Sequence, residues 1–249
     1  MKRLLDILFS FTGLVIMSPV LLFFMVLIWV QDHHSPLYVA PRAGRGGKPF
    51  QMIKLRSMVS NADKNGIDST AGTDERITGV GRIVRRYKLD EFSQLINVLT
   101  GDMSLVGPRP NVIREVGLYT DEETHLLDLR PGITDLASIV FSDEGDILAN
   151  SEDPDLKYNQ LIRPWKSRLG LLYIENHRIL LDLNIIILTL ISFLSRPLAL
   201  KGVQSILKKL GADNHLLRVA GRQEPLQPYP PPGADNIVIS REPSSAYSS

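Results

Sequence analysis

The side chains in this sequence that are best suited to chemistry are two adjacent carboxylates, Asp90 and Glu91. Four cationic side chains lie shortly before the pair: Arg82, Arg85, Arg86 and Lys88. Arg109 follows the pair and stands between two prolines. Nearby cations keep carboxylates ionised at neutral pH, and guanidinium groups match the geometry of phosphate oxygens. Since an ionised Asp can attack phosphorus once cations offset the charge of the phosphate, the pattern indicates phosphoryl chemistry.

The same residues also have ordinary structural explanations. Acidic residues favour the first turns of helices because they oppose the helix dipole. A run of basic residues can form a solvated face or contact anionic lipids. The residue types alone leave these alternatives open.

Several familiar catalytic patterns are absent from the sequence. It contains no glycine-rich phosphate loop, no nucleophile elbow and no paired-histidine zinc motif. The five histidines have no metal-ligand spacing, and the lack of cysteine excludes disulfides and thiolate sites. With 249 residues, a net charge of +1 and 44% apolar residues, the chain is not expected to be disordered as a whole or to bind nucleic acid.

The elements that must position these residues begin with an apolar segment from Leu4 to Val30. As a helix rising about 1.5 Å per residue it would be roughly 40 Å long, enough to enter a bilayer core about 30 Å thick. No small-residue cleavage site follows it, so we expect a retained anchor and not a signal peptide.

Positive charge flanks this anchor on both sides. Lys2 and Arg3 precede it, and basic residues without an acidic partner follow it between residues 34 and 61. Because positive flanks favour the cytoplasmic side, both ends are expected there. Ser18 and Pro19 lie near the middle, where proline can kink the helix. From these residues alone, a kinked spanning helix and a re-entrant helix both stay open.

The remaining pattern predicts short elements. We expect a strand at 49–58, a polar loop at 61–81, and a helix at 82–99 that ends near Gly101. Asp90 would lie early in that helix, on a polar face shared with Gln94 and Asn97.

The rest of the chain is predicted in the same way. We expect irregular backbone at 104–110, helix at 111–129 and a turn at 130–134. The apolar segment 179–194 is either a core helix or an interfacial one. The proline-rich and serine-rich end, from residue 222 onward, is expected to be disordered.

Three sequence blocks resemble successive signatures of the bacterial sugar transferases, which are monotopic phosphoglycosyl transferases. The blocks are KLRSM (54–58), GRIVRRYKLDEFSQLINVLTGDMSLVGPRP (81–110) and RPGIT (130–134). The segment KRLLDI (2–7) with Ser18 and Pro19 is similar to the re-entrant anchor of that family, and ILLDLNIII (179–187) resembles its closing helix. The resemblance covers roughly residues 1–200.

The resemblance implies a reaction and a role for each candidate residue. Asp90 would attack the sugar-bearing phosphorus of a nucleoside diphosphate sugar, and polyprenyl phosphate would then accept the phosphosugar. Glu91 would manage protons. Lys54, Arg85, Arg109 and Arg130 would bind substrate phosphate. Mg²⁺ (magnesium) near Asp90 is expected, because hard oxygen ligands bind it and it neutralises a diphosphate.

The resemblance also implies a fold and a location. We expect a mostly helical α+β protein with a re-entrant membrane anchor at 1–31, a catalytic domain at 32–210 and a largely disordered tail at 211–249. It would lie on the cytoplasmic face of the bacterial inner membrane. The donor is expected to be a UDP-sugar, the acceptor undecaprenyl or a related polyprenyl phosphate, and the assembly a homodimer.

One departure from the family concerns the residues after PGIT. Asp135 to Ser138 stand where the family commonly has Gly-Trp or a similar pair, so the sugar is not assigned. Two rival functions share the same residues: a membrane-anchored phosphodiesterase that uses water as acceptor, and a non-catalytic scaffold for anionic partners.

Overall fold

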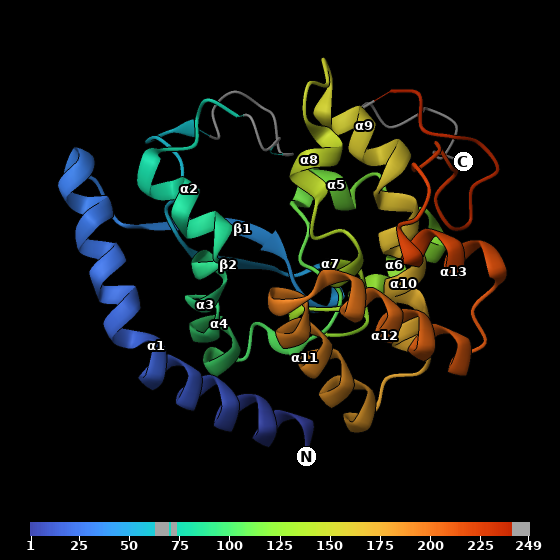
Figure 1. The fold of residues 1–249 in the computed structure, drawn as a ribbon, viewed down its shortest axis with the longest axis horizontal. Coiled ribbons are helices and arrows are strands. Elements are labelled where there is room, and N and C mark those ends of the chain that lie inside the picture. Colours follow the sequence, from blue (N-terminus) through green and yellow to red (C-terminus); the bar gives the residue numbers. More distant parts are fainter. Residues whose placement is uncertain (63–69, 71–73, 241–249) are drawn as a thin grey trace.

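The computed structural model describes residues 1–62, 70 and 74–240 as a mostly helical α+β fold (Figure 1). Residues 63–69 and 71–73 of the predicted loop at 61–81 and the end of the predicted tail lie outside the described residues. The first half contains these elements: α1 (Lys2–Asp32), β1 (Leu37–Ala43), β2 (Pro49–Leu55), α2 (Gly79–Arg86), α3 (Leu89–Phe92), α4 (Leu95–Thr100), β3 (Ser104–Val106), α5 (Ile113–Val116) and α6 (Asp121–Thr124).

The second half is almost entirely helical. It contains β4 (Gly132–Thr134), α7 (Leu136–Val140), α8 (Glu144–Leu148), α9 (Pro154–Leu161), α10 (Arg163–Glu175), α11 (Ile179–Leu194), α12 (Arg196–Lys209) and α13 (Asn214–Gly221). Short 3₁₀ turns occur at Arg45–Gly47 and His125–Leu127. The larger hydrophobic core joins β3 with the helices from α7 through α13. A smaller core joins α1, β2, α2 and α3.

Helix α1 confirms the predicted apolar helix and is long and apolar enough to cross a membrane. Its axis bends partway along its length (Figure 1). Pro19 has no N–H for the carbonyl of Val15, and the Ser18 hydroxyl donates to that carbonyl instead, at 2.8 Å. The Ser18–Pro19 pair therefore permits a bend without leaving the carbonyl unpaired.

Polar contacts attach both ends of α1 to the rest of the protein. Near one end, Lys2 pairs with Asp182 at 2.6 Å, and Asp6 accepts from Ser104 Oγ at 2.9 Å. At the other end, Asp32 accepts from Arg56 Nη2 at 2.6 Å. These contacts explain why an acidic residue interrupts the apolar segment at position 6.

The described residues form two small sheets of two strands each. β1 and β2 form an antiparallel hairpin, which confirms the predicted strand in its first seven residues. β3 and β4 pair in parallel, with Ser104 opposite Gly132 and Val106 opposite Thr134. The predictions of irregular backbone at 104–110 and of a turn at 130–134 are therefore wrong at these strands, because this pairing joins distant segments that local patterns do not reveal.

The predicted helix at 82–99 is broken in the structure. Lys88 adopts a left-handed conformation with φ of 51°, which separates α2 from α3. The predicted end at Gly101 is confirmed, since Gly101 caps α4 with φ of 98°. The predicted helix at 111–129 is likewise divided into short pieces, whereas α11 matches the apolar segment 179–194.

The expected tail differs from the structure over residues 214–240. Residues 214–221 form α13, whose Leu216 and Ala220 are buried in the larger core. The described residues beyond α13 pack on the protein through Leu226 and Tyr229. Composition predicted disorder there because prolines dominate, but a few apolar side chains suffice to attach an extended chain. Residues 241–249 lie outside the described part.

Candidate active site

Hydrogen bonds from two side chains, Asn97 and Ser93, attach α3 and α4 to strand β2. Asn97 accepts from Ile53 N at 2.9 Å and donates to Gln51 O at 2.7 Å, and Ser93 Oγ donates to Ile53 O at 3.3 Å. Lys54 follows directly on β2, so these bonds set it near the carboxylates at the start of α3. Asn97 is almost fully buried, as a residue with this positioning role should be.

Arg109 reaches the site from the loop after β3. Gly107 N donates to Thr134 O at 3.1 Å, and Gly132 N donates to Pro108 O at 2.9 Å, so β4 holds this loop. A Cβ on Gly132 would lie 2.1 Å from Gly107 N, and only glycine fits there. From this loop, Arg109 Nη2 donates to Glu91 Oε1 at 2.8 Å.

The Glu91–Arg109 pair is a charge-matched unit. Burial alone would raise the pKa of Glu91, but Arg109, Lys88 and Lys54 together lower it. The adjacent Glu91 raises the pKa of Arg109 against the effect of burial. Both side chains are therefore charged at neutral pH, as the sequence predicts for Glu91.

Asp90 has a different environment from its neighbour. Among the described residues, its carboxylate forms no hydrogen bond or ion pair. Burial raises its pKa, and Glu91 adds to this effect, while Lys54, Arg85 and Arg109 oppose it without cancelling it. The sequence-based expectation was that nearby cations keep both carboxyls ionised. The cations do lower the pKa of Glu91, but the pKa of Asp90 is raised, because the expectation neglected burial.

Lys54 is also affected by burial. Loss of solvent, together with the nearby Arg109, lowers the pKa of Lys54 to about 8, although Asp90 and Glu91 oppose this change. An amine with this pKa is charged at neutral pH and loses its proton in mildly alkaline solution. The site therefore contains a cation that a bound phosphate would stabilise.

The structure brings together five of the six predicted charged residues: Lys54, Arg85, Asp90, Glu91 and Arg109. We call this set the catalytic cluster. Arg130 is exposed and makes no hydrogen bond or ion pair within the described part of the chain, so its role stays a prediction. Ser18 and Pro19 lie on α1, away from any charged partner among the described residues.

Arg109 also lines a pocket that the sequence did not reveal. This pocket holds about 550 Å³ of empty space, part of it open to solvent, and its lining includes Arg109, Asn111, Tyr119, Tyr158, Arg163, Lys166 and Ser167. Burial raises the pKa of Tyr119 and Tyr158, so both phenols keep their protons. Because the lining comes from separate segments, no local motif could have identified it.

The side chains of the catalytic cluster could supply only some of the ligands that a divalent cation needs. No group of three or more acidic or histidine side chains that could hold a metal is found in the described ranges 1–62, 70 and 74–240. Mg²⁺ often binds through one or two carboxylates together with waters and substrate phosphates. The unpaired carboxylate of Asp90 fits that mode, in which the substrate supplies most of the ligands.

This arrangement can stabilise and attack a phosphate group. Three cations around an unpaired carboxylate attract a diphosphate and offset its charge. An oxygen of the Asp90 carboxylate, which has no partner in the part of the chain that the structure describes, can then attack the phosphorus atom.

Comparison with known proteins agrees with this chemistry. The family model described as bacterial sugar transferase matches residues 1–196. The chain is 36% identical over 207 residues to the exopolysaccharide production protein PSS of Rhizobium leguminosarum bv. phaseoli, which covers 79% of this chain and 96% of that protein.

Two longer relatives are named for their reactions. The chain is 38% identical over 141 residues to the UDP-glucose:undecaprenyl-phosphate glucose-1-phosphate transferase of Caulobacter vibrioides, which covers 55% of this chain and 53% of that protein. It is 40% identical over 154 residues to the undecaprenyl-phosphate galactose phosphotransferase of Salmonella typhimurium, which covers 55% of this chain and 32% of that protein. The chain thus spans about half or less of these two proteins.

Proposed function

The chain belongs to the bacterial sugar transferase family, and from that premise we propose that it transfers a sugar 1-phosphate from a nucleoside diphosphate sugar to polyprenyl phosphate. The donor is a UDP-sugar and the acceptor is undecaprenyl phosphate. The names of the relatives from Caulobacter and Salmonella support this acceptor. The product, a polyprenyl diphosphate sugar, starts the assembly of a surface glycan.

The observation that carries this proposal is the unpaired carboxylate of Asp90 within a group of cations. In the first step, an Asp90 oxygen attacks the sugar-bearing phosphorus of the donor. The bond from that phosphorus to the bridging oxygen breaks, and the nucleoside monophosphate leaves with the electron pair. The sugar phosphate is then bonded to Asp90 as an acyl phosphate, a mixed anhydride.

In the second step, an oxygen of polyprenyl phosphate attacks the same phosphorus. The bond to Asp90 breaks, the free carboxylate is restored and the diphosphate bond of the product forms. Glu91, held ionised by Arg109, accepts a proton from the acceptor phosphate if that phosphate arrives protonated. Lys54, Arg85 and Arg109 offset the charge of the phosphates in both steps.

Mg²⁺ fits this site as a companion of the substrate. Asp90 would contribute one oxygen ligand, with the remaining ligands from water and the diphosphate. When bound, the ion would neutralise the diphosphate and assist departure of the nucleotide.

The attachments of α1 support a re-entrant anchor. A helix that crossed the bilayer would carry its ends to opposite faces, whereas Lys2 and Asp32 bind to the same folded unit through Asp182 and Arg56. The bend in α1, a helix that contains Pro19, allows it to enter and return on one side.

Helix α11 extends the apolar surface of α1. Its outward side chains, among them Leu180, Ile187 and Leu190, are exposed, and Lys88 Nζ lies 5.7 Å from the ring centroid of Phe193. This contact places the end of α11 close to the segment that carries Asp90. An interfacial α11 would thus bring the catalytic cluster to the cytoplasmic surface of the inner membrane, where a soluble donor and a lipid acceptor can meet.

The decisive experiment traps the intermediate. Membranes containing the protein are given Mg²⁺ and UDP-sugars labelled in the sugar, first without acceptor and then with undecaprenyl phosphate. We expect label on the peptide that contains Asp90, followed by its transfer to lipid, and neither event in the Asp90→Asn variant. Asp146→Asn changes an exposed carboxylate outside the catalytic cluster and should behave as the wild type.

Other outcomes would select the rivals. Release of free sugar phosphate without lipid product would favour the phosphodiesterase, and full function in Asp90→Asn would favour the scaffold. The expected homodimer is tested separately by the mass of the protein in lipid nanodiscs.

A further inference from the structure

The described residues beyond α13 follow a defined path over the protein, although their composition predicts disorder. Residues 226–238 are proline-rich, contain no helix or strand and turn at Pro232 and Gly233, and Figure 1 shows this part of the chain, in red, running beside α9. They lie beyond the segment 1–196 that matches the family model. The contacts of this segment therefore belong to this chain and are not implied by the family match.

An aromatic groove formed by Trp165, Arg168 and His215 holds the side chain of Tyr229. The rings of Tyr229 and Trp165 stack with centroids 4.5 Å apart, and His215 meets Tyr229 edge-on at 4.9 Å. Arg168 Cζ lies 4.8 Å from the centroid of the Tyr229 ring. An aromatic ring held by two rings and a guanidinium is a specific contact, with packing and cation–π contributions.

Hydrogen bonds to the backbone of residues 226–238 extend this contact along the segment. Arg168 Nη1 donates to Pro230 O at 2.9 Å, and Gln160 Nε2 donates to Val238 O at 2.8 Å. In return, Tyr229 N donates to Gln160 O at 3.1 Å. Because prolines lack N–H groups, carbonyls are the main polar groups that an extended proline-rich chain offers, and aromatic grooves recognise such chains.

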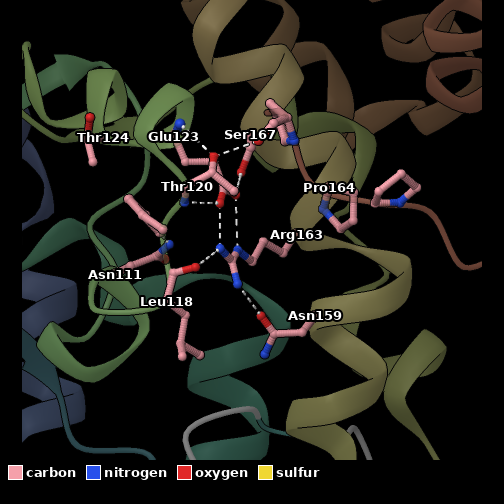
Figure 2. Close-up of polar contacts among 12 residues, drawn as sticks. Asn111, Leu118, Thr120, Glu123, Thr124, Asn159, Arg163, Pro164 and Ser167 are labelled. Atoms are coloured by element: carbon pink, nitrogen blue, oxygen red, sulfur yellow. Dashed lines mark hydrogen bonds and ion pairs between the residues drawn. The ribbon is translucent and has the colours of Figure 1, made fainter. Parts of the chain in front are cut away.

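A further bond links the segment to a buried polar network. Thr120 Oγ1 donates to Pro232 O at 2.6 Å, and Thr120 also caps α6 by accepting from Glu123 N at 3.1 Å. Glu123 in turn accepts from Ser167 Oγ at 2.6 Å and from Arg163 Nε at 3.0 Å (Figure 2). Thr120, Glu123, Arg163 and Ser167 are all buried.

This network forms one wall of the pocket beside Arg109. Arg163 and Ser167 line that pocket, as does Tyr119, the neighbour of Thr120 in sequence. The position of the wall therefore depends on the same network that the C-terminal segment contacts.

We propose that residues 226–238 form a C-terminal strap, docked in the aromatic groove, that positions the Arg163 wall of the donor pocket. Release of the strap weakens donor binding and leaves the chemical step at Asp90 unchanged. The part that concerns the donor rests on the proposed function, because the pocket is assigned to the donor through its contact with Arg109.

The test compares Tyr229→Ala with Tyr229→Phe in the full-length protein. The phenylalanine variant keeps the stacking ring and is the matched control. Hydrogen exchange is measured over residues 118–123, 159–168 and 226–238. We expect faster exchange in all three ranges for Tyr229→Ala, and wild-type protection for Tyr229→Phe.

Steady-state kinetics provides the functional readout. For Tyr229→Ala we expect the KM for UDP-sugar to rise at least about fivefold, with kcat within about twofold of the wild type. Tyr229→Phe should match the wild type in both constants. A purely structural loss would instead reduce the active fraction, and therefore kcat, at constant KM.

Two results would overturn the proposal. One is wild-type hydrogen exchange at 118–123 and 159–168 in Tyr229→Ala, and the other is an unchanged KM despite a released strap. If the wild type forms no lipid-linked product, the proposed function fails, while hydrogen exchange still decides whether the strap holds the wall.

Discussion

Two groups of charged residues contribute to the lining of the pocket, and they differ in how completely they are paired. In the buttress cluster of Thr120, Glu123, Asn159, Arg163 and Ser167, every nitrogen of the Arg163 guanidinium donates a hydrogen bond, and both Glu123 oxygens accept two. In the catalytic cluster, Arg109 pairs with Glu91, and Asp90 has no partner among the described residues.

Under the proposed function, this difference separates charged groups that hold the fold together from charged groups that act on the substrate. A fully paired buried ion pair fixes one geometry and has little capacity left for a ligand. An unpaired carboxylate beside several cations destabilises the fold slightly and remains available to a substrate. Pairing therefore distinguishes the two groups better than residue type does, and burial follows pairing, since the buttress cluster is buried and the catalytic cluster is only half-buried.

The largest expected effect tests the functional side of this contrast. Asp90→Asn should lower kcat by at least about 10⁴-fold, because it removes the proposed nucleophile. The same substitution should leave thermal stability at pH 7 unchanged or raise it. Burial raises the pKa of Asp90 in the folded state, so its ionised form opposes folding above that pKa. A large loss of thermal stability would contradict the contrast.

The next effect tests the structural side. Arg163→Met should lower the free energy of unfolding by about 3–5 kcal/mol, because it leaves Glu123 buried without its counter-ion. Denaturant unfolding in detergent measures this change. The double variant Arg163→Met with Glu123→Leu should recover much of the loss, and failure to do so would mean that the pair is not the main contribution.

A smaller effect concerns the pH dependence of the catalytic cluster. The pKa of Lys54 is lowered to about 8, so kcat/KM should fall as pH rises through this value, by about tenfold at pH 9. Lys54→Arg keeps the positive charge and should remove this fall. The exposed Lys48 provides a control, because Lys48→Arg should leave the pH profile unchanged.

The smallest expected effect lies at the edge of the buttress cluster. Thr120→Val keeps the shape of the side chain but removes the cap of α6 and the bond to Pro232, at a cost of about 1–2 kcal/mol in unfolding free energy. Thr120→Ser retains the hydroxyl and should cost less. Equal destabilisation by both variants would show that the methyl group matters more than the hydrogen bonds.

The catalytic cluster was predictable because most of it is local in sequence. Asp90, Glu91 and Arg85 lie within seven consecutive residues, and the prolines around Arg109 mark a constrained loop. Lys54 was assigned to the site only through resemblance to the family. The hydrogen bonds of Asn97 and Ser93 that bring β2 beside α3 join segments about 40 residues apart, and no local pattern reveals them. The break at Lys88 was missed, because a left-handed lysine has no clear sequence signal.

The long helices were predicted well, and the contacts between distant segments were not. Helices α1 and α11 follow from continuous apolar character. The parallel pairing of β3 with β4, the pairing of Glu123 with Arg163 and the docking of Tyr229 each join segments that are far apart in the chain. Local periodicity contains no information about such partners.

The contacts near the start of α1 also constrain the order of events during synthesis. Lys2 bonds to Asp182, a residue 180 positions later in the chain. The ribosome must therefore have made the end of α10 and the beginning of α11 before the first turn of the anchor can find its ion pair. Until then Lys2 lacks this partner, whereas Ser104, the partner of Asp6, has already been made. The ion pair of the first turn of the anchor is thus a late contact in biosynthesis, one that forms only after Asp182 has been made.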